Sequence, residues 1–221
     1  MQSVNQFIQE IREEYHRRLN RYPNLENPKR LSDKIQWLKI YDQHMDQITC
    51  MDKLAVKDWV DDRVPNVTIP STNSYPAVLK CTHDSGSVVF VNSFTEEQVA
   101  RKKLEQQLKK PYGIGKGEWA YRFIPPAILK EERINNSDVD YKFHCVNGKI
   151  KWLQMIWDSY SNKTKESIID VNGNVTQYHM DQTMSHVEQK HFCTDEQFIE
   201  LKRLAETLAE GWKYVRVDLY W

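Results

Sequence analysis

The segment near the end of the chain places an arginine and a carboxylate among apolar residues. Residues 214–220 read Tyr-Val-Arg-Val-Asp-Leu-Tyr, an alternating, β-branched pattern that predicts a strand. Arg216 and Asp218 lie two apart, so they share one face of that strand. Because an unpaired buried charge is costly, each needs a partner. Either the two form a structural ion pair, or Asp218 binds a metal ion while Arg216 faces phosphate oxygens.

A lysine stands where a second apolar segment ends. Residues 75–81 predict a strand, and Lys80 comes just before the polar turn at 82–86. The free backbone N–H groups of such a turn, together with a lysine, can hold a phosphate. The alternative is a lysine that extends into solvent from the end of a strand.

Two further pairs of charged residues fall within predicted strands. Glu131 and Glu132 are adjacent in segment 127–134, so they face opposite sides and at most one points into a given cleft. Either can instead be a solvated charge on an edge strand. Asp140 and Lys142 lie two apart and share a face. They form either a cross-strand ion pair or a site in which the lysine lies beside a nucleotide.

Other motifs exclude several kinds of site. The glycine-rich segment 112–118 does not follow a strand and open a helix, which excludes a Rossmann or Walker phosphate loop and predicts a flexible lid or linker. The close histidine–cysteine pairs lack the spacing that zinc requires. The sequence contains no G-x-S-x-G nucleophile elbow. These exclusions leave the charged residues named above, either as structural ion pairs and solvated charges or as a phosphate and metal site.

Length and composition limit the partners and the compartment. The chain has 221 residues, which suits one large domain or two small ones. Its formal net charge of zero gives no global attraction to nucleic acid. It has no apolar run of about 18 residues, so we expect no membrane span. The N-terminal residues lack a signal-peptide pattern, which predicts a cytoplasmic protein with reduced cysteines. The sequence leaves the oligomeric state open.

The hydrophobic periodicity predicts helices first and then mostly antiparallel hairpins, an α+β fold. We expect Ser3, Ser32 and Thr95 to be helix N-caps, and Asn147 and Gly148 to form a two-residue hairpin turn. The predicted helices span 3–20, a segment beginning near residue 32, 51–62, 96–110 and 195–210. The predicted strands span 75–81, 87–92, 127–134, 140–146, 149–156, 167–171, 175–178 and 214–220.

Six blocks of the sequence, taken in order, resemble the TupA-like branch of the ATP-grasp superfamily. This branch comprises proteins of cell-surface polysaccharide and teichuronopeptide gene clusters, and its members are often labelled glycosyltransferases. The order of the blocks makes the match specific. They are residues 28–42, 52–57, 78–86, 128–132, 140–149 and 215–219.

The resemblance implies an ATP- and Mg²⁺-binding α+β protein with a nucleotide cleft between two antiparallel-sheet subdomains. It implies an N-terminal helical region at 1–72, a small subdomain at 73–134 and a C-terminal subdomain at 135–221. Asp218 is implied as the metal ligand, and Arg216 and Lys142 as catalytic residues. The residues implied to bind ATP are Lys80, His83, Ser85, Gly86, Glu131, Glu132 and Lys142.

In the family pattern, a further strand after the aspartate strand carries a glutamate and an asparagine as metal ligands. This chain ends at Trp221, so we expect an ATP-grasp fold without its last core strand: either a truncated form, a form that has lost catalysis, or one whose site a partner completes. The resemblance implies an ATP-dependent carboxylate–amine or amino-acid ligase in surface-polysaccharide or capsule assembly, with a small-molecule or glycan-precursor substrate. One alternative is a glycosyltransferase, for which Asp138 and Asp140 have a D-x-D spacing. The other is a catalytically inactive protein that binds nucleotide or glycan.

Overall fold

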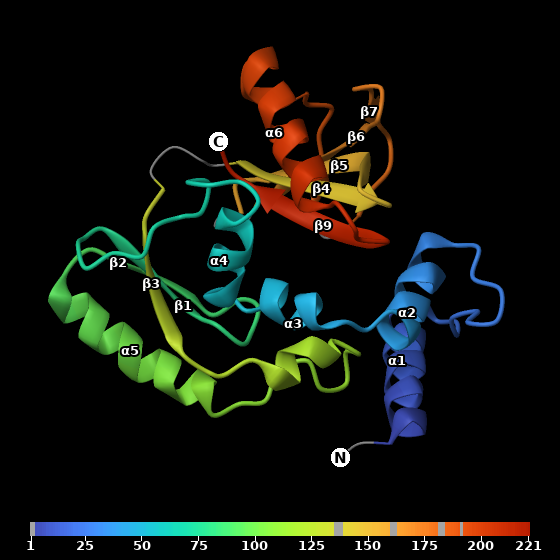
Figure 1. Cartoon of the computed structure of the whole chain (residues 1–221), viewed down its shortest axis with the longest axis horizontal. Coiled ribbons are helices and arrows are strands. Elements are labelled where there is room, and N and C mark those ends of the chain that lie inside the picture. Colours follow the sequence, from blue (N-terminus) through green and yellow to red (C-terminus); the bar gives the residue numbers. More distant parts are fainter. Residues whose placement is uncertain (1–2, 135–138, 160–162, 181–183, 191) are drawn as a thin grey trace. The chain divides into compact units, whose positions relative to one another are not determined.

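The computed structural model describes residues 3–134, 139–159, 163–180, 184–190 and 192–221, so Asp138 of the D-x-D spacing lies outside the described residues. The elements are helices and mostly antiparallel sheets, which confirms the predicted α+β class (Figure 1). The chain divides into two compact units. The first comprises Met1–Trp59 and Thr68–Arg133, and the second comprises Val60–Val67 and Ile134–Trp221.

The first unit contains the N-terminal helices and a small sheet of three strands. Strand β1 is central and pairs antiparallel with β2 and β3. The helices that begin in this unit are α1 (Val4–Leu19), α2 (Leu31–Tyr41), α3 (Met45–Met51), α4 (Ala55–Asp61), α5 (Phe94–Leu108) and the short 3₁₀ helix η1 (Trp119–Phe123). The strands are β1 (Ala77–Cys81), β2 (Val88–Val91) and β3 (Ile128–Glu132).

Helix α5 lies beside this sheet and covers one of its faces (Figure 1). Ala77, Leu79 and Cys81 are fully buried in the core that α5 closes. Because side chains alternate along a strand, Lys80 lies on the opposite face. Glu131 is on that face too, since it stands in register with Val78, the residue between Ala77 and Leu79. The alternation of β1 therefore directs Lys80 and Glu131 to the same side of the sheet.

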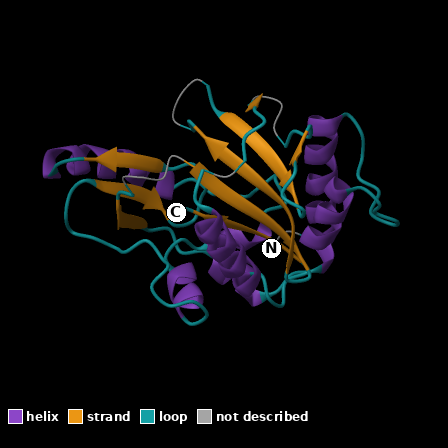
Figure 2. Ribbon diagram, turned by 90° about the horizontal axis from the view of Figure 1, so that it is seen from above, coloured by secondary structure: helices purple, strands orange, loops and turns teal. Residues whose placement is uncertain are grey.

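The second unit is built on a larger sheet, whose twisted strands lie side by side in Figure 2. The strand order is β7-β6-β5-β4-β9, and β8 pairs with β6. The strands are β4 (Val139–Val146), β5 (Lys149–Trp157), β6 (Lys165–Asp170), β7 (Val175–Thr176), β8 (Ser185–His186) and β9 (Tyr214–Leu219). Helix α6 (Asp195–Leu208) packs on one face, where Phe143, Met155 and Leu201 form the buried centre.

Several local predictions are confirmed. Helix α1 begins after Ser3, whose hydroxyl accepts a hydrogen bond from the N–H of Gln6 in a capping box. Asn147 and Gly148 join β4 to β5 with φ values of 50° and 72°, as this hairpin turn requires. In the described residues, no helix combines the length and the apolar character needed to cross a bilayer.

Other local predictions are wrong. Ser32 is not an N-cap, because α2 begins at Leu31 and the Ser32 hydroxyl lies 2.9 Å from the hydroxyl of Tyr15. The cap of α5 is Ser93 rather than Thr95.

The predicted helix at 51–62 is also wrong, because two short helices, α3 and α4, take its place. Asp52 adopts an extended conformation between them, and its carboxylate accepts a hydrogen bond from the N–H of Leu54 at 2.8 Å. A carboxylate that binds a nearby backbone N–H competes with helix continuation.

Candidate functional site

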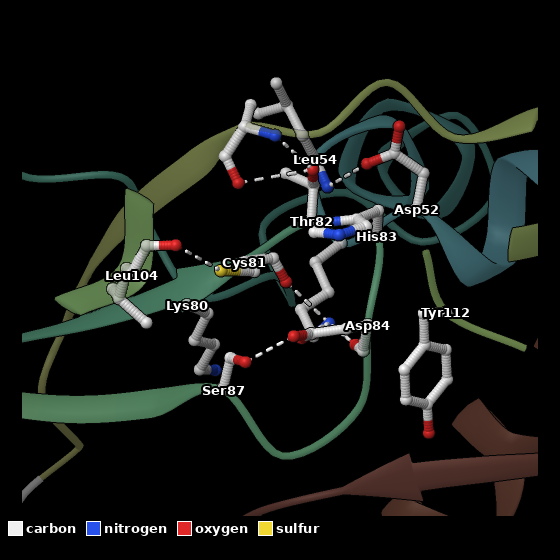
Figure 3. Close-up of polar contacts among 12 residues, drawn as sticks. Asp52, Leu54, Lys80, Cys81, Thr82, His83, Asp84, Ser87, Leu104 and Tyr112 are labelled. Carbon is white, nitrogen blue, oxygen red and sulfur yellow. Dashed lines mark hydrogen bonds and ion pairs between the residues drawn. The ribbon is translucent and has the colours of Figure 1, made fainter. Parts of the chain in front are cut away.

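In the first unit, the turn between β1 and β2 carries Thr82, His83 and Asp84, whose positions Figure 3 shows. Thr82 anchors its start, since its hydroxyl donates to the carbonyl of Pro125 and accepts from the N–H of Ala127, each at 2.9 Å. Gly86 has a φ of 103°, a conformation that favours glycine. Among the described residues, no group accepts a hydrogen bond from the N–H groups of residues 83–87. A run of free N–H groups in a turn is suited to bind an anion.

Lys80 lies next to this turn, and its ammonium group pairs with a buried carboxylate. Its Nζ is 2.7 Å from Oε2 of Glu131, while Nζ of Lys57 is 2.6 Å from Oε1 of the same residue. The side chain of Glu131 is 6% exposed, and that of Lys80 is 24% exposed. Two lysines around one carboxylate leave a net positive charge, which would attract phosphate oxygens.

The other residues predicted to bind ATP in this unit lie either in the turn after β1 or on the opposite side of β3 from Glu131. His83 is buried in the turn, with Nε2 3.3 Å from the carbonyl of Lys110, while Ser85 and Gly86 are exposed at the tip. Glu132 is exposed and faces away from Glu131, as adjacent residues on a strand must. The structure thus brings Lys80, Glu131 and the turn together and separates Glu132 from them.

In the second unit, the sheet face opposite α6 carries four charged side chains from β4 and β9. Both carboxylate oxygens of Asp218 accept hydrogen bonds from Arg216, each at 2.7 Å. Lys142 stands in register with Asp218, and its ammonium lies 3.0 Å from Asp218 Oδ2 while also donating to Asp140. The predicted pairing of Asp140 with Lys142 and of Arg216 with Asp218 is therefore present, and Lys142 joins the two pairs.

The surroundings shift the pKa values of Asp140 and Asp218 in opposite directions. Burial raises the pKa of Asp140 above its ordinary value, and the nearby ammonium of Lys142 only partly offsets this. Burial also acts to raise the pKa of Asp218, but the hydrogen bonds from Arg216 and Lys142 outweigh it and lower that pKa. Asp218 therefore stays ionised at neutral pH, as a metal ligand must.

The donors on this face fit a magnesium ion that is held partly by phosphate. No group of three or more histidine, cysteine, aspartate or glutamate side chains suited to a metal occurs among the described residues. Mg²⁺ needs only one or two carboxylates where substrate phosphates supply other ligands. Oδ1 of Asp140 is buried and has no hydrogen-bond partner, and Asp218 shares the ammonium of Lys142 with it. The two carboxylates are thus candidate ligands.

Beside these charges lies an aromatic group that includes a buried histidine. His144 is 2% exposed and stacks on Trp152 with ring centroids 4.6 Å apart. Its Nδ1 lies 2.9 Å from the hydroxyl of Tyr214. Burial, assisted by the charge of Arg216, lowers the pKa of His144 to about 4, so the ring is neutral at pH 7. This group forms a rigid, uncharged support next to Arg216.

Sequence reasoning missed Lys53, Lys57, His144 and Tyr214. Lys53 and Lys57 are four residues apart, the spacing of one helix face, and this spacing was the available signal. The contacts they make reach residues 28 and 74 positions away, which no local pattern reveals. His144 follows Asp140 and Lys142 at the same two-residue period, so alternation alone would have placed it on their face.

Comparison with known proteins finds a match to a family model and a match to a solved structure. A family model described as TupA-like ATPgrasp matches residues 33–221. Among solved structures, a D-alanine–D-alanine ligase from Bacillus anthracis matches 78% of this chain at 14% sequence identity, with a TM-score of 0.46. The chain spans 55% of the length of that ligase. No curated protein matches the sequence.

Proposed function

Because the chain belongs to the TupA-like ATP-grasp family, we propose that it is an ATP-dependent ligase that joins a carboxylate to an amine. The observation that carries the proposal is the run of free N–H groups at residues 83–87 beside Lys80. Such a turn binds an anion, and the adjacent lysines favour a highly charged one such as a polyphosphate.

The proposed reaction has two steps. A substrate carboxylate oxygen attacks the γ-phosphorus of ATP, the bond to the β-phosphate oxygen breaks, and ADP leaves with that electron pair. An amine then attacks the carbonyl carbon of the acyl phosphate, which expels inorganic phosphate and loses a proton to give an amide. Both steps need charge neutralisation and positioning more than a protein nucleophile. Lys80 and the turn would hold phosphate oxygens in place.

In the second unit, we assign the charged sheet face to the cation that accompanies ATP. Asp218, together with Asp140, would hold Mg²⁺. The ion, when bound, neutralises charge on phosphoryl oxygens. Arg216 and Lys142 now pair with these carboxylates and would turn toward phosphate oxygens when the ion takes their place. His144, which stands in register with Arg216 and contacts Tyr214, would limit the movement of the arginine.

The substrate class and two alternatives follow from the family. We propose a small-molecule or glycan-precursor substrate in cytoplasmic steps of surface-polysaccharide assembly. A specific observation favours an inactive nucleotide-binding protein as second candidate, because Asp218 already accepts three hydrogen bonds from two cationic side chains. No contact among the described residues specifically favours the glycosyltransferase alternative.

A thermal-shift assay with Mg·ATP, UDP-sugars and GDP-sugars tests the proposal. A ligand at about 100 times its Kd stabilises the folded state by about 2.7 kcal/mol. For a chain of this length, that corresponds to a rise in Tm of about 5–10 °C. The ligase proposal predicts this rise with Mg·ATP. A rise with nucleotide sugar alone contradicts it, and a rise with Mg·ATP without ADP release across a panel of carboxylate and amine substrates supports the inactive binder.

A substitution links the response to the proposed residue. Lys80→Ala should reduce the affinity for Mg·ATP about tenfold or more, because it removes a charge-assisted contact. The matched control is Lys149→Ala, which removes an exposed lysine that pairs with Glu206 in the second unit. Equal affinity of wild type and Lys80→Ala would remove Lys80 from the site.

A further inference from the structure

Lys53 reaches from the α3–α4 junction into the turn between β1 and β2. Its ammonium donates to the carbonyl of Cys81 at 2.7 Å and to the carbonyl of Asp84, and it lies 3.9 Å from the Asp84 carboxylate. These groups lie at the start and in the middle of the turn. One side chain therefore ties together two backbone positions three residues apart.

A lysine suits this position because its donors match the acceptors around it. An ammonium group has three N–H donors and no acceptor, and the turn presents two carbonyl oxygens and one carboxylate oxygen. The side chain of Lys53 is 28% exposed, and burial lowers its pKa below the ordinary value while the charge of Asp84 raises it. The group is thus largely enclosed by the turn that it binds.

The junction that carries Lys53 is itself held in place. The carboxylate of Asp52 accepts from the N–H of Leu54 at 2.8 Å, and the N–H of Val56 donates to the carbonyl of Asp52 at 2.9 Å. These bonds fix the backbone on both sides of Lys53. The ammonium is consequently presented to the turn by a rigid segment.

In this turn, the backbone carbonyl groups and the backbone N–H groups differ in whether they have a hydrogen-bond partner. Lys53 engages two carbonyls, those of Cys81 at the end of β1 and of Asp84 in the turn, whereas the N–H groups of residues 83–87 donate to no group among the described residues. A short polar turn whose carbonyls were free could rotate its peptide groups and turn oxygens toward an incoming anion. We propose that Lys53 is a positioning residue, which holds the carbonyls inward and so keeps the N–H groups of residues 83–87 available to phosphate.

This inference rests on the proposed function, since the anion is taken to be the polyphosphate of ATP. Lys53 differs from Lys80 in its role. Its donors are directed to the turn, so it acts through the backbone and does not contact the ligand. The role predicts a loss confined to the phosphate part of the ligand, whereas a general loosening of the unit would weaken binding of every part.

Isothermal titration calorimetry of the full chain with Mg·ATP and competition experiments with adenosine test this role. The variants are Lys53→Met, which keeps the length of the side chain and removes its donors, and Lys53→Gln, which keeps one amide donor group. The matched control is Lys39→Met. Lys39 also donates to a backbone carbonyl in the first unit, that of Lys116 at 3.1 Å, but in a different loop.

We expect Lys53→Met to raise the Kd for Mg·ATP about tenfold, with Lys53→Gln in between, because charge-assisted hydrogen bonds to two carbonyls are lost. The Kd for adenosine should be unchanged in all variants, and Lys39→Met should bind Mg·ATP as wild type does. If Lys53→Met does not fold, Lys53→Gln carries the same test.

Three results would overturn the inference. Wild-type affinity for Mg·ATP in the Lys53 variants would reject the positioning role and leave the proposed function intact. Equal losses for Mg·ATP and adenosine, or an equal loss in Lys39→Met, would identify a general structural effect. No binding of Mg·ATP by wild type would contradict the proposed function, and the role of Lys53 would fall with it.

Discussion

The carboxylate of Glu131 is shared by two lysines, and this arrangement predicts strong energetic coupling between them. Each carboxylate oxygen pairs with one ammonium, Oε1 with Lys57 at 2.6 Å and Oε2 with Lys80 at 2.7 Å. All three side chains are largely buried, with exposures of 6%, 14% and 24%. The perturbation is the replacement of each lysine by methionine, singly and together.

The expected magnitudes follow from what remains around the carboxylate. A single replacement leaves Glu131 with one ammonium as counter-ion, so each should reduce the free energy of unfolding by about 1.5 kcal/mol, well below the cost of a buried charge left without any partner. The double replacement of Lys57 and Lys80 leaves an uncompensated buried carboxylate, which should reduce it by about 5 kcal/mol. The double variant therefore loses about 2 kcal/mol more than the sum of the single variants.

Urea unfolding at neutral pH measures the three differences, provided that the m-values stay equal. A coupling energy below about 0.5 kcal/mol, the usual limit of additivity, would refute the shared ion pair. The control is the same cycle in a Glu131→Gln background. A neutral amide needs neither lysine as a counter-ion, so the coupling should disappear there.

Three further results are expected. Hydrogen bonds from Lys130, Tyr75 and Arg101 lower the pKa of Glu97 from 4.5 to about 2. Because the pKa is lower in the folded state, ionised Glu97 stabilises the fold above about pH 5, and this stabilisation is lost as the pH falls toward 2. Urea unfolding should show this acid loss in wild type and a smaller one in Glu97→Gln. Gly117→Ala should reduce stability by about 1–3 kcal/mol more than Gly115→Ala, because both residues have positive φ but only at Gly117 would the added carbon lie 2.4 Å from a side chain of α1; equal losses would contradict this. Asp218→Asn should make ATP binding insensitive to Mg²⁺ in calorimetry, whereas retained magnesium dependence would exclude Asp218 as a ligand.

The sequence predicted the parts of the fold that depend on local patterns. Alternation placed Arg216 and Asp218 on one face of the last strand, and Asp140 and Lys142 on one face of another, as the structure has them. It could not show that Lys142 and Asp218 are neighbours, because their contact depends on which strands pair and in which register across 76 residues.

The predicted helix at 51–62 shows that a local side-chain contact can interrupt a helix that the apolar periodicity predicts. The apolar period continues through this segment, but the carboxylate of Asp52 binds the N–H of Leu54 and ends the helix there. This break directs Lys53 toward the turn after β1, a contact that joins residues 28 positions apart. Helix periodicity therefore predicted a helical segment here, but it did not predict the contact of Lys53 with the turn.

The proposed function depends on binding of the ATP phosphates by the backbone N–H groups of residues 83–87. Titration of ¹⁵N-labelled protein with Mg·ATP, followed by amide NMR spectra, tests it directly. The proposal predicts that the amide signals of residues 83–87 shift together, with one Kd that agrees with calorimetry. Saturable binding of Mg·ATP that leaves these five amide signals unmoved would contradict it.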